Sequence, residues 1–179
     1  MGFVEVKMKI LEKLWEEGRP MRPKDVAQRI GLKVSATTMY LLRLKREGHA
    51  STPQNGSYAI TDLGKEAIGI PKMDKTHAAK MLNDLPVDKA FHFYTDINQH
   101  LDIYANSLSD FCDKIQKVDV KSIEFHATRK DFENWFQGLG DVGLAKRIST
   151  IRNMNLNGED LRRKVHDAAK LRLQELKRL

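Results

Sequence analysis

One short stretch brings together side chains that could move a proton, namely His126, Arg129 and Asp131. An imidazole bonded to a carboxylate is common in catalytic sites, where the surroundings adjust its pKa for proton transfer. The same residues are also typical of helix caps and of pairs inside a fold, because aspartate is a preferred N-cap residue. We favour this structural role, with Asp131 as a cap, and predict no catalytic residue.

A second set, His92, Asp96 and His100, has a spacing of four residues. If the segment is helical, the three side chains lie on one face, as the ligands of a metal ion require. If it is a strand, they do not form one stripe. The aromatic run 91–94 fits a short strand or the start of a helix, and the sequence leaves both open. Isolated spacings of this kind often arise by chance, so we expect no metal and no other cofactor.

Motifs of the common enzyme classes are absent from the sequence, which has no phosphate-binding glycine loop, HExxH, GxSxG or CxxC. We therefore expect that the protein is not an enzyme. Cys112 is the single cysteine, which excludes an intrachain disulfide and suits a reducing compartment, the cytoplasm. Its apolar surroundings in the sequence predict a buried, inert thiol.

The composition of the 179 residues, 41% hydrophobic and 31% charged, is that of a folded protein with one or two domains. The net charge is +7, and residues 1–70 are more basic per residue than residues 71–179. A basic chain attracts polyanions, of which nucleic acid is the commonest. No apolar run is long enough to cross a membrane, and the N-terminus has neither a signal peptide nor a myristoylation pattern.

Three helices are predicted in the first 50 residues. Apolar residues recur at helical spacing from about 4 to 17. Pro23 suits the first turn of a second helix, which Gly31 ends. A third helix is expected over about 34–47, and its buried stripe consists of Thr37, Leu41 and Leu44.

A β-hairpin is predicted next. Residues 49–53 and 57–60 can both extend, and Gln54-Asn55-Gly56 between them is a tight-turn signal, since Asn and Gly tolerate a positive φ. Thr61 then caps a short helix over 62–68. The first 70 residues therefore form one domain, with three helices and a hairpin.

These segments resemble the winged helix-turn-helix family of transcription regulators over residues 4–68. The resemblance lies in the stretches 25–31 (DVAQRIG), 41–48 (LLRLKREG) and 58–64 (YAITDLG), the last of which is common after the wing. It implies that the third helix enters the major groove of DNA and that the wing lies along the backbone.

The outward face of the third helix is then the expected DNA-binding site, together with the wing tip. Arginine can donate two parallel hydrogen bonds to guanine, which makes Arg43 and Arg46 the main candidates. The wing tip contains no Lys or Arg, and a basic helix face can also be merely solvated. The predicted contact residues are Lys33, Ser35, Ala36, Thr38, Met39, Arg43, Arg46 and Asn55.

A second domain, all-helical or mostly helical, is predicted over residues 71–179. Its helices are expected to follow the cap residues Asp74, Ser107, Asp119, Thr128, Asp141 and Asn157. Residues 107–148, with the string SIEFH at 122–126, Arg129 and Trp135, resemble an uncharacterised helical domain family of prokaryotes. That resemblance implies a domain and carries no activity.

The final helix has an apolar stripe that core packing explains most simply. A homodimer seam is the alternative, because DNA regulators commonly pair to match two half-sites. The stripe consists of Leu161, Val165, Ala169, Leu173 and Leu176, with Ala168 beside it.

The sequence thus predicts a mainly α protein that regulates transcription by binding double-stranded DNA, with no membrane partner. The second domain would dimerise the chain or sense an effector that the sequence does not identify. The alternative is an interaction module in which the winged helix binds protein or RNA in a larger assembly.

Overall fold

The protein is mainly helical, as expected, with two small antiparallel sheets of two strands each. The structure is a computed structural model that describes residues 2–179. The chain divides into two compact units, Met1–Lys72 and Met73–Leu179, and the division lies two residues beyond the expected one.

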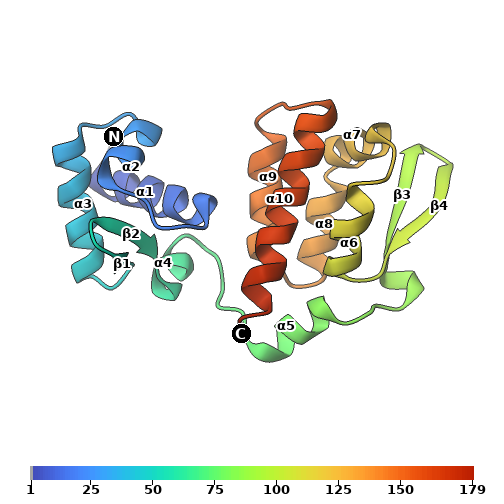
Figure 1. Ribbon diagram of the computed structural model, residues 1–179, viewed down its shortest axis with the longest axis horizontal. Helices are drawn as coiled ribbons and strands as arrows, with labels where there is room; N and C mark the ends of the chain where they lie inside the picture. The colour runs from blue at the N-terminus through green and yellow to red at the C-terminus, as the bar shows by residue number, and fades with distance from the viewer. Residues whose placement is uncertain (1) are drawn as a thin grey trace. The chain divides into compact units, whose positions relative to one another are not determined.

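The first unit contains the three helices, the hairpin and the short helix that the sequence predicts, with bounds within two residues of those expected (Figure 1). The helices are α1 (Phe3–Glu17), α2 (Pro23–Ile30), α3 (Val34–Arg46) and α4 (Asp62–Ala67), and the strands are β1 (Ala50–Gln54) and β2 (Ser57–Ile60).

Two glycines set the turns of this unit. Gly31 ends α2 in the left-handed conformation, with φ 70°, and begins the three-residue connection to α3. At the hairpin turn Gly56 has φ 74°, whereas Asn55 is not left-handed. The turn therefore needs a positive φ at one of its two central residues, and not at both.

The core of the first unit forms between α1, α3 and the hairpin. Thr37, Leu41 and Leu44 of α3 are all buried, as predicted, and each is at most 1% exposed. One strand-like contact of this core has no local signal in the sequence. Met21, between α1 and α2, exchanges two backbone hydrogen bonds of 2.8 Å with Tyr58 of β2, which fastens the α1–α2 connection to the hairpin.

The second unit is mostly helical and has one hairpin. The aromatic run 91–94 lies in the first strand of this hairpin and is therefore not a helix start. The elements of this unit are α5 (Lys75–Leu82), η1 (Val87–Lys89), β3 (Phe91–Asp96), β4 (Gln99–Ala105), α6 (Leu108–Ile115), α7 (Val120–Arg129), α8 (Asp131–Gly138), α9 (Val142–Arg152) and α10 (Gly158–Leu176). In Figure 1 the hairpin lies at one side of the helices α6 to α10 of its unit.

Most of the predicted helix caps of this unit are present. The side chains of Asp74, Ser107, Asp119 and Asp141 each accept a backbone N–H in the first turn of the following helix. The prediction for Thr128 is wrong, because Thr128 lies inside α7 and donates to the carbonyl of Glu124. Asn157 stands at the N-cap of α10, but its side chain makes no capping bond.

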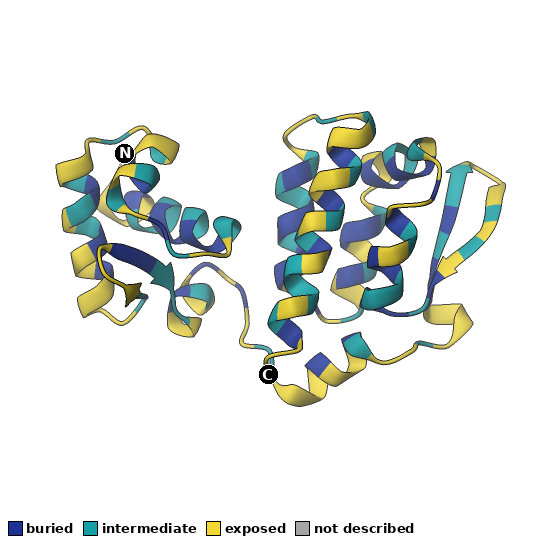
Figure 2. Ribbon diagram, viewed as in Figure 1, coloured by how far each residue is buried: buried dark blue, intermediate teal, exposed yellow. Residues whose placement is uncertain are grey.

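The core of the second unit contains the α10 stripe. Leu161, Val165, Ala169 and Leu176 are buried in it, and Leu173 and Ala168 pack against it. Figure 2 shows buried and exposed positions alternating along α10. Packing within one protomer therefore accounts for the stripe, and these side chains are not free to form a dimer seam. Cys112 is buried in the same core, and burial raises the pKa of its thiol to about 11, so almost no thiolate forms at neutral pH.

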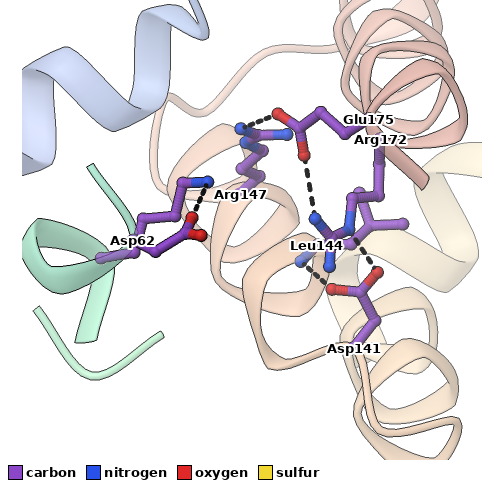
Figure 3. Close-up of polar contacts among 7 residues, drawn as sticks. Asp62, Asp141, Leu144, Arg147, Arg172 and Glu175 are labelled. Carbon is purple, nitrogen blue, oxygen red and sulfur yellow. Dashed lines mark hydrogen bonds and ion pairs between the residues drawn. The ribbon is translucent and has the colours of Figure 1, made fainter. Parts of the chain in front are cut away.

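A buried ionic network joins α9 to α10 (Figure 3). Asp141 is fully buried and accepts the Leu144 N–H at 2.8 Å and Nε of Arg172 at 2.6 Å. Glu175 accepts bonds of 2.8 Å from Arg147 and 2.9 Å from Arg172. Burial alone would raise the pKa of Glu175, but the two arginines lower it, so its carboxylate stays ionised. The Asp141 carboxylate is therefore both a helix cap and an inter-helix contact.

We predict that Gly64→Ala destabilises the first unit by about 1–3 kcal/mol or more, the usual cost of overpacking. A Cβ at Gly64 would lie 2.2 Å from the His49 carbonyl oxygen and 2.8 Å from Cγ1 of Ile60, so α4 and the hairpin would have to separate. Urea unfolding followed by the fluorescence of Trp15, in a Trp135→Phe background, measures the change.

The matched control is Gly138→Ala, because a Cβ there meets no atom within 4 Å and φ is not positive. This control should leave the Trp15 transition where it is. An unchanged transition in Gly64→Ala would show that α4 does not pack against the hairpin in this way.

Candidate nucleic-acid interface

The predicted contact residues lie on the solvent side of α3 and at the hairpin tip. Lys33, Ser35, Met39, Arg43, Arg46 and Asn55 are exposed, and Ala36 and Thr38 are half-buried. They share this side because Thr37, Leu41 and Leu44 turn the opposite face of the helix to the core. Seven of the eight residues thus belong to α3 or its N-cap. Asn55 lies in the turn between β1 and β2.

The charge of this helix has one sign. From Lys33 at its N-cap to Arg46 at its end, the helix has no acidic residue. The same stretch contains four basic residues, Lys33, Arg43, Lys45 and Arg46. Within residues 2–179, Lys33, Lys45 and Arg46 have no carboxylate partner within 4 Å. These cations are therefore available to an external anion.

Arg43 is held by side chains that the sequence did not single out. Its Nε donates to Glu47 at 3.1 Å, and its guanidinium lies 4.4 Å from the centre of the Phe3 ring. Lys7 of α1 donates to the same Glu47 at 2.6 Å. The hydrogen bonds from Lys7 and then Arg43 keep the pKa of Glu47 below its ordinary value. The spacing of four between Arg43 and Glu47 could have revealed this pair, but nothing near in sequence points to Lys7 or Phe3.

Thr38 is less suited to phosphate contact than the sequence suggests. Its hydroxyl donates to the carbonyl of Val34 at 2.8 Å, so the proton is already used inside the helix. A phosphate oxygen accepts and does not donate, and Thr38 would have to break this bond to reach it.

An apolar groove of about 540 Å³ runs along the same face of α3. Met39 is 71% exposed, and Leu42 and Phe3 are each exposed by more than two fifths. The sequence interpretation did not name Phe3 or Leu42. The groove is lined by Phe3, Ala36, Met39, Tyr40, Leu42, Arg43 and Arg46.

His126, Arg129 and Asp131 do converge, but as a structural group. The Nδ1 atom of His126 lies 2.8 Å from Asp131, and Nε2 accepts the backbone N–H of Tyr94 at 2.9 Å. His126 is 3% exposed, and both of its nitrogens are used. The expected cap is wrong, because Lys130 holds the N-cap position of α8. The imidazole ties β3 to α7 and α8, and neither nitrogen is left for a substrate.

His92 and His100 lie on neighbouring strands, whereas Asp96 accepts the N–H of Ile97 in the hairpin turn. Because this segment forms strands, His92, Asp96 and His100 do not form one helical stripe, as expected for the strand alternative. Among residues 2–179, no three His, Cys, Asp or Glu side chains are grouped so as to hold a metal ion.

Comparison with known families matches residues 58–170 to DUF5752, a family of unknown function. The chain belongs to the DUF5752 family. The matched region begins in β2, includes α4 and continues through most of α10, so α3 lies outside it. No curated protein and no solved structure matches the chain. In the described part of this DUF5752 protein, no helix is sufficiently long and apolar to span a membrane.

We predict that the folded DUF5752 protein loses stability as the pH falls below about 6.5, because burial lowers the pKa of His126 against the opposing effect of Asp131. The unfolded chain takes up this proton first, and protonation in the folded state would break the bond from the Tyr94 N–H. Urea midpoints between about pH 7.5 and about pH 5.5 measure the loss.

His126→Gln should be less stable at the higher pH and should lose part of this pH dependence. His77→Gln, at an exposed position on α5, should keep all of it. Equal pH dependence in the wild type and His126→Gln would show that His126 is not the group that titrates.

Proposed function

We propose that this protein is a transcription regulator whose first unit is a winged helix-turn-helix that binds double-stranded DNA through α3. The order of elements supports the proposal, since α2, a three-residue connection and α3 are followed by the β1–β2 hairpin as a wing. The bridge between Met21 and Tyr58 gives the hairpin a third, single-residue strand.

The observation that carries the proposal is the solvent face of α3. Its side chains include four cations and no carboxylate between Lys33 and Arg46, and three of the cations have no partner within the described chain. Each phosphate that a Lys or Arg neutralises releases counterions, which favours binding. Arg46 is exposed without an ion pair, and Arg43 bonds Glu47 through Nε, so both could turn terminal N–H groups toward phosphate or guanine.

The dimensions of α3 also suit a major groove. A helix of 13 residues is about 20 Å long, and the groove of B-DNA is about 12 Å wide, enough to admit a helix. The cations stand at both ends of α3, Lys33 at the first turn and Arg43 to Arg46 in the last. They could therefore reach phosphates on both sides of the groove while Ser35, Ala36 and Met39 face the bases.

The second unit would then dimerise the chain or sense an effector, in the cytoplasm, where the buried Cys112 thiol stays reduced. Pairing two winged helices would multiply sequence specificity. The surface that pairs them lies outside the α10 stripe, because that stripe is filled within one protomer.

The groove beside Phe3, Met39 and Leu42 favours a second candidate, a module that docks onto another protein. Exposed apolar side chains gathered in one groove commonly mark a contact site. This candidate requires no affinity for duplex DNA, and a docking contact through apolar side chains depends little on salt.

We predict that Arg43→Ala together with Arg46→Ala weakens binding of the full chain to a mixed-sequence duplex. The slope of log affinity against log salt should fall by about two, close to one for each lost phosphate contact. Fluorescence anisotropy of labelled duplex over a salt series measures both quantities, and thermal unfolding checks that the fold is intact.

The matched control removes two cations elsewhere, by Arg163→Ala together with Lys164→Ala, both exposed on α10. It changes the net charge equally and should preserve the slope. Equal effects of the two double variants would remove α3 from the interface, and no binding by the wild type would favour the docking module.

A further inference from the structure

The outer side of the β3–β4 hairpin holds two histidines that face one another. Nδ1 of His92 lies 3.4 Å from Nε2 of His100, and the ring centres are 5.6 Å apart. Tyr104 lies against His92 and Tyr94 against His100, with ring centres 5.7 and 4.9 Å away. His92 is half-buried and His100 is exposed, so the pair is open to solvent.

A bulge in β4 creates this pair. His92 is opposite Tyr104, and with regular pairing His100 would be opposite residue 96. Instead His100 is opposite Tyr94, because β4 contains two extra residues there and Asp102 is left-handed, with φ 53°. The bulge moves His100 two residues closer to His92 along the strand. Bulges that redirect side chains occur often beside functional sites.

The hydrogen bonds of the two rings leave a lone pair on Nδ1 of His92, and on Nε2 of His100 when Nδ1 of His100 carries the proton of that ring. Nε2 of His92 lies 2.9 Å from the carbonyl of Val87, which can only accept, so Nε2 carries the proton and Nδ1 does not. Nδ1 of His100 lies 2.9 Å from the Asp102 carboxylate, which favours a proton on Nδ1 and leaves Nε2 bare. The Asp102 N–H is 3.0 Å from the same Nδ1, so without a cation the proton can move to Nε2 and bond His92.

We propose that His92 and His100 bind a divalent transition-metal ion of the zinc class. Two nitrogens at about 2.0–2.1 Å from a tetrahedral ion lie about 3.3 Å apart, and the observed separation is 3.4 Å. Imidazole suits zinc, copper and nickel ions. The two outer partners, the Val87 carbonyl and the Asp102 carboxylate, are of the kind that orient metal-bound histidines.

Water or a further ligand would fill the other positions of the ion, because the described residues contribute no third His, Cys, Asp or Glu. The site is therefore open. Its ion replaces the shared proton between the two rings, so protons compete with metal binding. An ion that binds both strands stabilises the folded hairpin over the unfolded chain.

Titration of the untagged full chain with zinc ions, by calorimetry near pH 7.5, tests the site. The expected result is one ion per chain, with affinity at least about tenfold lower in His92→Gln and in His100→Gln, and about tenfold lower in Asp102→Asn. His77→Gln, another exposed histidine next to an aspartate, should bind as the wild type does.

Thermal unfolding with and without EDTA distinguishes a lost ligand from a lost fold. The His92 and His100 variants should melt like the metal-free wild type with or without zinc. Zinc should raise the melting temperature of the wild type and, among the histidine variants, of His77→Gln only. The proposal is overturned if the wild type binds no zinc, or if His92→Gln and His100→Gln bind it as tightly as the wild type does.

Discussion

The surface of the first unit depends on the burial of Thr37, Leu41 and Leu44. A helix with 3.6 residues per turn can give only one stripe to the core, and these three side chains occupy it. The remaining faces of α3 are therefore fixed toward solvent, with their basic residues. The Lys7–Glu47–Arg43 contacts then hold the end of α3 against α1. The same packing that stabilises the unit thus produces a cationic, partly apolar helix face.

In the second unit, buried polar side chains hold the helices and the hairpin against one another. His126 joins the hairpin to α7 and α8, and Asp141 joins the start of α9 to α10. Removing one member of such a buried pair leaves the other without a partner, which costs more than the pair contributes. The hairpin is thereby anchored through the backbone N–H of Tyr94 on β3, which is opposite His100 and two residues from His92. The anchoring explains how an exposed pair of imidazoles keeps a defined geometry at the edge of a helical unit.

Local signals allowed most elements to be predicted, and long-range contacts account for the errors. The caps at Asp74, Ser107 and Asp141 give the starts of the following helices almost to the residue, whereas the helix ends are predicted less closely. The run 91–94 was ambiguous because so short an aromatic segment has no clear period until Phe91 and Phe93 are seen to be buried. The β4 bulge shifts a register, and the groove needs Phe3 to meet α3 from a distant part of the chain. Neither feature has a signal in the local sequence. The candidate residues on α3 could therefore be predicted, whereas Phe3 beside them could not.

The central claim is that α3 is the surface that meets duplex DNA. Backbone amide chemical shifts of the full ¹⁵N-labelled chain, recorded as a mixed-sequence duplex is added, test it residue by residue. We expect the largest changes over Lys33 to Arg46, with smaller ones at the hairpin tip near Asn55, and we expect them to reverse when salt is raised. Changes confined to residues 73–179, or spread evenly over all exposed cations, would contradict the account.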